Sequence, residues 1–163
     1  NNGATIFTYP VKDPGRFGVV KIGKNRKVIS LEEKPKKPNS NLAVTGLYFY
    51  DNGVIKYVNE LKPSKRGELE ITDLNKIYMK KGKLKAIELS RGYAWLDTGT
   101  ASSLIESSQF IHTIESRQGL KVACIEEVSY RNKWINKKQI IQLSRGLNNE
   151  YGAYLKSILR ETN

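Results

Sequence analysis

The sequence has little of several features that define common protein classes. Its one cysteine, Cys124, excludes an internal disulfide, and its setting in "KVACI" predicts a small buried side chain. Its one histidine, His112, stands in a predicted helix with no cysteine or second histidine nearby, which argues against a metal site there. No apolar run approaches the roughly 18 residues that a bilayer-spanning helix needs, and no signal peptide opens the chain. We therefore expect a cytoplasmic protein with no membrane partner.

Acidic residues are also in deficit. The 163 residues include 28 Lys and Arg against 16 Asp and Glu, a formal charge of +12. Such an imbalance favours an anionic partner, whether nucleic acid, an acidic membrane or phosphorylated small molecules. The basic residues are spread along the chain, and no run reaches the five or six like charges of a nucleic-acid tail. A basic nucleic-acid-binding module therefore stays an alternative, without any of the usual motifs in its support.

The first half of the chain reads mainly as strands. "FGVVKI" and "KVISLEE" predict a paired hairpin, and "LAVTGLYFYD" predicts a strand whose nearly continuous apolar run indicates burial on both faces. Further strands are predicted in "GATIFTYPV" and "KLKAIEL". Between them, Thr72 or Asp73 is a candidate cap for a helix that stops at Gly82.

The second half reads mainly as helices. A longer helix is predicted from Thr100 to just before Gly119, one more short strand within "LKVACIEEVSY", and two short helices at the end of the chain. The pattern predicts a mixed α/β fold with helices on both faces of a sheet and a helical C-terminal appendage.

Three predicted loops concentrate groups that bind sugars, phosphates or metal ions. Glu33 and Lys34 end a strand, where a carboxylate can accept sugar hydroxyls and an ammonium can neutralise a phosphate. Arg66 precedes a glycine in "RGELE" and can clamp a phosphate with two hydrogen bonds. Asp97 in "WLDTGT" can offer Mg²⁺ a carboxylate alongside phosphate oxygens. Each also has a plain alternative: a solvated charge pair, a surface arginine, and a helix cap near Thr98 and Thr100, respectively.

Five stretches resemble the bacterial glucose-1-phosphate thymidylyltransferases, in that family's order and over nearly the whole chain. They are "RFGVV", "SLEEKPKKPNSNLAVTGLYFYD", "LKPSKRGELEITDLNKIY", "RGYAWLDTGT" and "RQGLKVACIEEVSYRNKWI". The resemblance covers the family's C-terminal half and implies part of its Rossmann-like nucleotide-diphospho-sugar transferase fold. The glycine-rich loop of the form GGxGTRLxPxT and a second metal-binding aspartate do not occur here. We therefore expect a piece of a longer enzyme, inactive alone.

The resemblance implies a reaction and roles for individual residues. The family makes dTDP-glucose and pyrophosphate from dTTP and glucose 1-phosphate, by in-line attack that rests on positioning and charge stabilisation. Asp97 would bind Mg²⁺, and another sugar-1-phosphate nucleotidyltransferase specificity stays open. The expected sugar-phosphate site has Gly18 bordering the sugar, Glu33 on its hydroxyls, Lys34 and Arg66 as catalytic groups on the phosphate, and Val44 and Tyr48 lining the pocket.

The resemblance also implies regulation and assembly. The family serves dTDP-rhamnose and cell-surface polysaccharide synthesis, forms homotetramers and binds a nucleotide between subunits, where dTDP-rhamnose can act as a feedback ligand. We expect residues 1–120 to form the sugar-phosphate-binding half of the transferase domain, and residues 121–163 to serve regulation and oligomerisation. The matching regulatory positions are Arg91, Val122, Ala123, Glu127 and Arg131.

Overall fold

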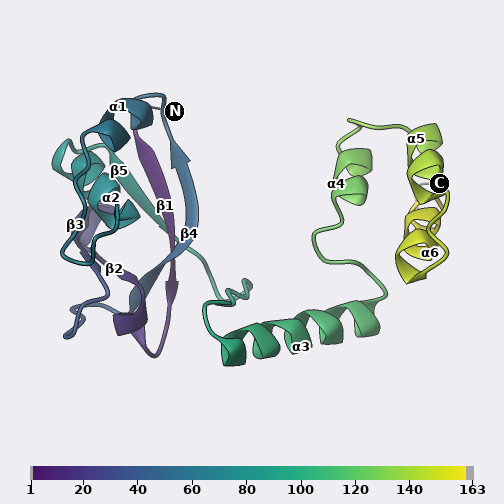
Figure 1. Cartoon of the computed structure of the whole chain (residues 1–163), viewed down its shortest axis with the longest axis horizontal. Helices are drawn as coiled ribbons and strands as arrows, with labels where there is room; N and C mark the ends of the chain where they lie inside the picture. The colour runs from purple at the N-terminus through teal and green to yellow at the C-terminus, as the bar shows by residue number, and fades with distance from the viewer. Residues whose placement is uncertain (1, 161–163) are drawn as a thin grey trace. The chain divides into compact units, whose positions relative to one another are not determined.

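The computed structural model describes residues 2–160, which fall into two compact units, Asn1–Trp95 and Leu96–Asn163 (Figure 1). The first unit holds every strand and the second is helical. The units divide after Trp95, before the functional boundary that we expect after residue 120, because the long helix α3 (Ala101–Gln118) belongs to the second compact unit. The functional boundary stays a prediction, since compactness does not test it.

The first unit is built on a five-stranded mixed sheet with the order β3-β2-β4-β1-β5. The pairs along it are antiparallel except for β1 and β5, which run parallel. This confirms the mixed α/β class and the β2–β3 hairpin. The strands are β1 (Ala4–Pro10), β2 (Gly18–Ile22), β3 (Val28–Glu33), β4 (Leu42–Tyr50) and β5 (Leu84–Glu88), with short 3-10 turns η1 (Pro14–Arg16) and η2 (Lys24–Arg26) and helices α1 (Val54–Asn59) and α2 (Ile71–Lys80).

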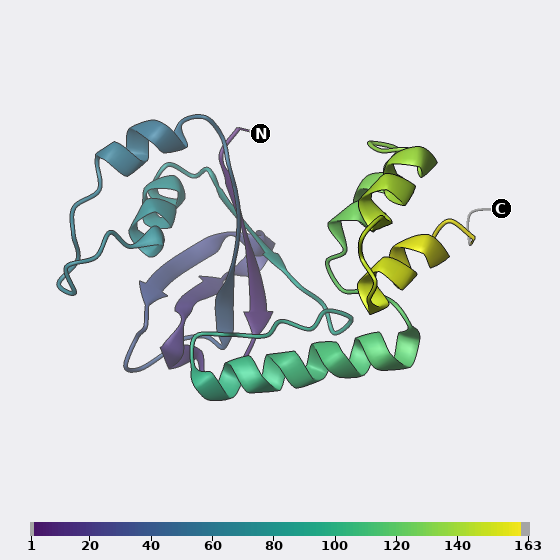
Figure 2. The ribbon, with the colours of Figure 1, turned by 45° about the vertical axis from the view of Figure 1, so that its right-hand side comes forward.

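Both helices of this unit lie on the same face of the sheet, so the prediction of helices on both faces is wrong for this unit (Figures 1 and 2). Alternation along the strands puts Ile6, Val20 and Leu31 on that face, where each is at most 3% exposed. Leu74 and Tyr78, one helical turn apart on α2, pack beside them, and both are buried. Burying each of the larger side chains contributes about 1.5–3 kcal/mol, so this face carries the unit's core.

The opposite face of β4 corrects an expectation. Leu47 and Phe49 are 48% and 51% exposed, so the prediction that this strand is buried on both faces is wrong. The register between β1 and β4 shifts between Ile6 and Thr8, and Gly46 has a φ of +84° at this irregularity. Only a residue without a side chain adopts that backbone readily. An apolar run alone does not reveal that only one of its faces is covered.

Asp51 ties three segments of the first unit together. Its carboxylate accepts hydrogen bonds from Gly3 N at 2.7 Å, Tyr78 Oη at 2.8 Å and Gly53 N at 3.0 Å. It therefore joins the residue before β1, the end of β4 and the last turn of α2. The hydrogen bond from Tyr78 lowers the pKa of the Asp51 carboxyl below its ordinary value of 3.8, and the two backbone donors act in the same direction.

Up to residue 160, the second unit contains four helices, of which α5 and α6 lie side by side (Figure 1). Cys124, Ile140, Leu155 and Ile158 form its buried core, which confirms the buried position predicted for Cys124. The helices are α3 (Ala101–Gln118), α4 (Ile125–Arg131), α5 (Lys137–Ser144) and α6 (Glu150–Ser157).

Of the predictions for the ends of the long helix, for the cap of α2 and for one further strand, only those for the long helix are confirmed. Thr100 caps α3 through Ser103 N, and the helix ends at Gly119 with a φ of +67°, as predicted. No side chain caps α2, so the predicted Thr72 or Asp73 cap is wrong. The strand predicted within 120–130 is also wrong, because α4 occupies most of it.

Asp51→Asn should make the stability of the fold less dependent on pH. Because the folded-state pKa of Asp51 is depressed, its contribution is present above the unfolded pKa of about 3.9 and is lost as the pH falls through the folded value. The wild type should therefore melt several degrees above the variant at about pH 6, and this gap should narrow towards about pH 3. Thermal unfolding followed by circular dichroism measures both gaps. A gap of the same size at both pH values would contradict the role given to the ionised carboxylate.

Candidate functional site

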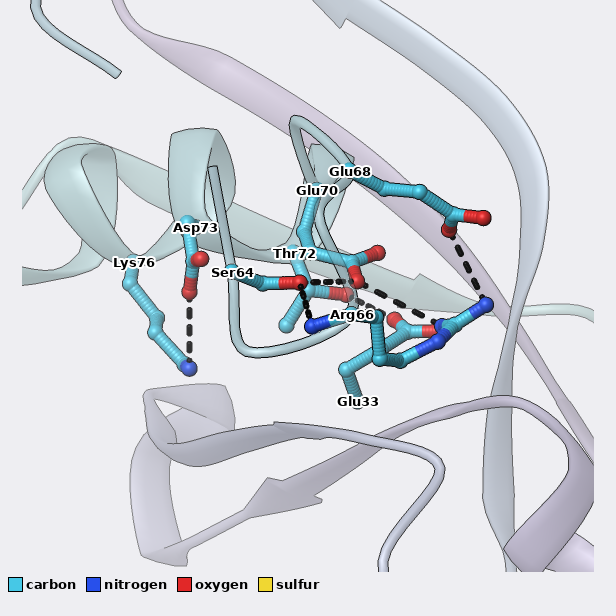
Figure 3. Close-up of polar contacts among 8 residues, drawn as sticks. All are labelled: Glu33, Ser64, Arg66, Glu68, Glu70, Thr72, Asp73 and Lys76. Carbon is cyan, nitrogen blue, oxygen red and sulfur yellow. Dashed lines mark hydrogen bonds and ion pairs between the residues drawn. The ribbon is translucent and has the colours of Figure 1, made fainter. Parts of the chain in front are cut away.

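The centre of the candidate site lies where β2, β3 and α2 meet. Gly18 pairs with Glu33 across the β2–β3 ladder, and the Glu33 carboxylate accepts a short hydrogen bond from the buried Thr72 hydroxyl (Figure 3). A Cβ atom at position 18 would lie 3.2 Å from Thr72 Oγ1, 3.3 Å from Glu33 Oε2 and 3.8 Å from Val44 Cβ. The absence of a side chain at Gly18 therefore leaves open the space beside a half-buried carboxylate.

Tyr48 faces the same region from β4. Burial raises the pKa of the Tyr48 hydroxyl above its ordinary value of 10.0, and the negative charge of Glu33 raises it further. The hydroxyl thus stays protonated at neutral pH and can donate a hydrogen bond. The structure brings Gly18, Glu33, Val44 and Tyr48 together, while their roles towards a sugar stay predictions.

Lys34 leaves the strand immediately after Glu33. Its φ is +42°, and its backbone N donates to Phe17 O at 3.0 Å, so the chain bends there before Pro35. Strict alternation would place the side chains of Glu33 and Lys34 on opposite faces. The bend means that this strand geometry no longer applies at Lys34, whose side chain is exposed.

Arg66 lies in the loop that leads into α2. Its guanidinium contacts Glu68 at 2.9 Å and Glu70 at 3.4 Å, and Ser64 Oγ donates to the same Glu70 carboxylate at 2.9 Å (Figure 3). The Glu70 side chain is 11% exposed, whereas that of Glu68 is 59% exposed. Arg66 is therefore anchored on a largely buried carboxylate, two residues before Thr72 in the chain, and also touches an exposed one.

Asp97 belongs to the second unit, next to the start of α3. Its Oδ1 accepts from Gly99 N at 3.2 Å, and its backbone O accepts from Ser107 Oγ at 3.0 Å. Thr100 is the N-cap of α3, so the cap alternative for Asp97 is wrong. Within residues 2–160 no three His, Cys, Asp or Glu side chains gather as a metal site. A carboxylate with phosphate oxygens still suits Mg²⁺, so Asp97 is compatible with a site completed by a substrate.

Four of the five regulatory positions lie in and before α4. Val122 is exposed, Ala123 has a φ of +57°, and Glu127 accepts hydrogen bonds from Tyr154 Oη and from Arg131 Nε, the latter at 2.7 Å. Burial raises the pKa of the Glu127 carboxyl, but these two hydrogen bonds outweigh it and leave the pKa below its ordinary value. Arg91 is an exposed residue of the first unit. A shared nucleotide site therefore stays a prediction.

Sequence reasoning missed Thr72 as part of the site and gave it a capping role. The contact with Glu33 joins residues 39 positions apart, which no local pattern predicts. The available signal was its place in "ELEITD", a polar residue in the first turn of an amphipathic helix.

None of the helices in residues 2–160 has the length and hydropathy needed to cross a bilayer.

Comparison with known proteins gives concordant results. The family model described as "Nucleotidyl transferase" matches residues 1–114. A glucose-1-phosphate thymidylyltransferase from Neisseria meningitidis is 49% identical over 98% of this chain and 56% of its own length. The enzyme of that name from Xanthomonas campestris is 53% identical over 97% of this chain and 54% of its own. The chain thus spans about half the length of the curated relatives it matches.

Solved structures agree on the fold. A Bacillus anthracis protein assigned to glucose-1-phosphate thymidylyltransferase and crystallised with sucrose is 51% identical, with a TM-score of 0.60 over 68% of this chain and 44% of its own. A UDP-glucose pyrophosphorylase complexed with UDP-glucose shares the fold at 24% identity, with a TM-score of 0.61 over 68% of this chain and 44% of its own. The chain belongs to the nucleotidyl transferase family.

Proposed function

We propose that the chain forms the sugar-phosphate-binding part of a glucose-1-phosphate thymidylyltransferase, which makes dTDP-glucose and pyrophosphate from glucose 1-phosphate and dTTP. The observation that carries the proposal is the half-buried Glu33 carboxylate, which Thr72 holds beside the open space at Gly18. Relatives of that name at about 50% identity support the thymidylyl specificity. The alternative is another sugar-1-phosphate nucleotidyltransferase specificity.

Glu33 is suited to orient the sugar. One of its oxygens accepts the Thr72 hydroxyl, which fixes the carboxylate and leaves acceptor capacity for sugar hydroxyls. Gly18 lets the ring approach the backbone, and Val44 and the protonated Tyr48 hydroxyl border the same space. Holding the sugar in one orientation aims its phosphate oxygen at the nucleotide, and such positioning supplies much of the rate in phosphoryl transfer.

Lys34 and Arg66 are suited to bind the phosphate group of glucose 1-phosphate. Two anions must meet in the reaction, and cationic groups reduce their repulsion. The exposed Glu68 can give way to the phosphate, while the more buried Glu70 keeps the guanidinium in place. The phosphate would then replace the Glu68 carboxylate as a partner of Arg66, and the guanidinium would keep its position beside Glu70.

Mg²⁺ would be held by Asp97 together with phosphate oxygens of the nucleotide. When bound, it would supply positive charge to the reacting phosphates. We further propose that the enzyme serves the dTDP-rhamnose pathway and assembles as a homotetramer in the cytoplasm. A feedback ligand such as dTDP-rhamnose would bind at Arg91, Val122, Ala123, Glu127 and Arg131.

The proposal is tested by separating binding from turnover. The 163-residue chain should bind glucose 1-phosphate saturably in calorimetry, at least about tenfold more tightly than glucose, because the phosphate adds charge-assisted hydrogen bonds. It should release no pyrophosphate with dTTP and Mg²⁺. A chimera that places these residues behind the N-terminal half of the Neisseria meningitidis relative should release pyrophosphate from dTTP in the presence of glucose 1-phosphate. Failure of the chain to bind the sugar phosphate, or substantial turnover by the chain alone, would contradict the proposal.

Thr72→Val should weaken binding of glucose 1-phosphate about threefold to tenfold, because the Glu33 carboxylate loses the hydrogen bond that fixes it. Calorimetry on the 163-residue chain measures the change. Thr5→Val on β1 is the matched control and should leave the dissociation constant unchanged. An unchanged affinity in a folded Thr72→Val chain would show that Glu33 does not need this partner.

Asp97→Asn in the chimera should lower the Mg²⁺-dependent kcat at least about 100-fold, because a metal ligand stabilises charge in the transition state. Its melting temperature should stay close to that of the parent. Asp73→Asn removes a carboxylate that pairs at 2.9 Å with Lys76 on the surface of α2, and it serves as the control with unchanged kcat. A large loss of stability with an unchanged rate per folded molecule would instead make Asp97 a structural residue.

A further inference from the structure

A cavity of about 370 Å³ lies where α4 ends and α5 begins, within the second unit. Its volume is in the range of small-molecule sites, which are mostly apolar with a few convergent polar groups. Isoleucine side chains and a tyrosine ring give it an apolar lining, and two lysines also line it. The lining residues that matter here are Tyr130, Lys133, Ile135, Asn136, Lys137 and Ile158.

The charged residues that line this cavity are all cationic. Every lining residue that the structure describes is neutral or cationic, and Arg131 adds a third cation held by Glu127 at 2.7 Å. Across residues 2–160, neither Lys133 nor Lys137 forms an ion pair with a described carboxylate. Both lysines line the same cavity without a described counter-charge, so an anion bound there would interact favourably with each of them.

The start of α5 adds to this positive potential. Asn136 and Gln139 form a reciprocal capping box, which satisfies the amides of those two residues only. The first turn carries no acidic residue, although a helix N-terminus favours negative charge. It carries Lys137 and Lys138 instead. The N-terminus of α5 and the lysine side chains therefore both favour a bound anion.

Lys133 occupies a backbone position that favours glycine. The end of α4 closes with hydrogen bonds from Lys133 N to Tyr130 O and from Trp134 N to Ser129 O, both 2.9 Å, and Lys133 has a φ of +61°. A lysine there costs stability relative to glycine. The same turn directs the chain so that Lys133 lines the cavity.

We propose that this cavity is a binding site for a phosphate monoester whose other end is a flat or apolar ring. Lys133, Lys137 and the first amides of α5 hold the phosphate, and the ring packs on Ile135 and Ile158. The inference does not rest on the proposed transferase activity, since all of its residues belong to the second unit. Trp134, which is 72% exposed and adjacent in sequence, provides a fluorescent reporter.

The test is a titration of the ¹⁵N-labelled 163-residue chain with phenyl phosphate, followed by amide shifts and by Trp134 fluorescence. The shifts should saturate, be largest at the amides of residues 133–138, and give a dissociation constant at least about fivefold below that of inorganic phosphate. Phenol alone should produce no saturable shift. Absence of saturation by about 10 mM, or largest shifts at residues 121–127, would overturn the proposal. Equal affinity for inorganic phosphate would overturn the role of the ring.

Variants separate a binding role from a structural one. Lys133→Gly relieves the backbone and should raise the melting temperature, yet it should weaken phenyl phosphate binding about tenfold because a cation is lost. Lys137→Gln should weaken binding to a similar extent. Lys138→Gln removes the same charge from the same helix at a residue that does not line the cavity, and should change affinity less than about twofold. Wild-type affinity in Lys133→Gly, or an equal loss in Lys138→Gln, would overturn the site.

Discussion

The hydrogen bond from Thr72 to Glu33 is the contact on which the candidate site depends. A carboxylate at the half-buried end of a strand is costly unless donors compensate for lost water. Thr72, itself 3% exposed, is such a donor, and it fixes the first turn of α2 against the end of β3. Gly18 is then constrained as well, because any side chain there would press on both partners. One contact therefore defines the position of the carboxylate, the helix and the open space.

The loop before α2 extends this arrangement towards the phosphate. Arg66, Ser64 and Glu70 form a connected polar group in which the most buried carboxylate has two partners. A guanidinium held in this way loses little further side-chain entropy when it binds an anion. Thr72 follows Glu70 by two residues, so the start of α2 holds both Glu33, proposed to bind the sugar, and Arg66, proposed to bind the phosphate. The loop and the helix thus support both proposed roles together.

Local patterns in the sequence predicted most strands and the long helix, because alternation, turn residues and caps are local signals. The cap at Thr100 and the stop at Gly119 were predictable for that reason. The exposed face of β4 was not, since an apolar run contains no information on which face is covered. The strand expected within 120–130 was wrong because α4 begins at Ile125. Glu126 and Glu127, which favour the first turn of a helix, were the overlooked signal.

Of the candidate site, the sequence supplied residue identities, and only through family resemblance did it supply roles. The structure removes one of the two explanations that the sequence left open for Asp97. Because Thr100 caps α3, the capping explanation that competed with metal binding no longer applies, although the bond to Gly99 N still gives Asp97 a part in a local turn. One carboxylate binds Mg²⁺ poorly unless phosphate oxygens complete the shell. A metal that arrives with its nucleotide would therefore depend on those phosphate oxygens and on the second aspartate that the family resemblance implies, which couples charge neutralisation to the complex in which the phosphates meet.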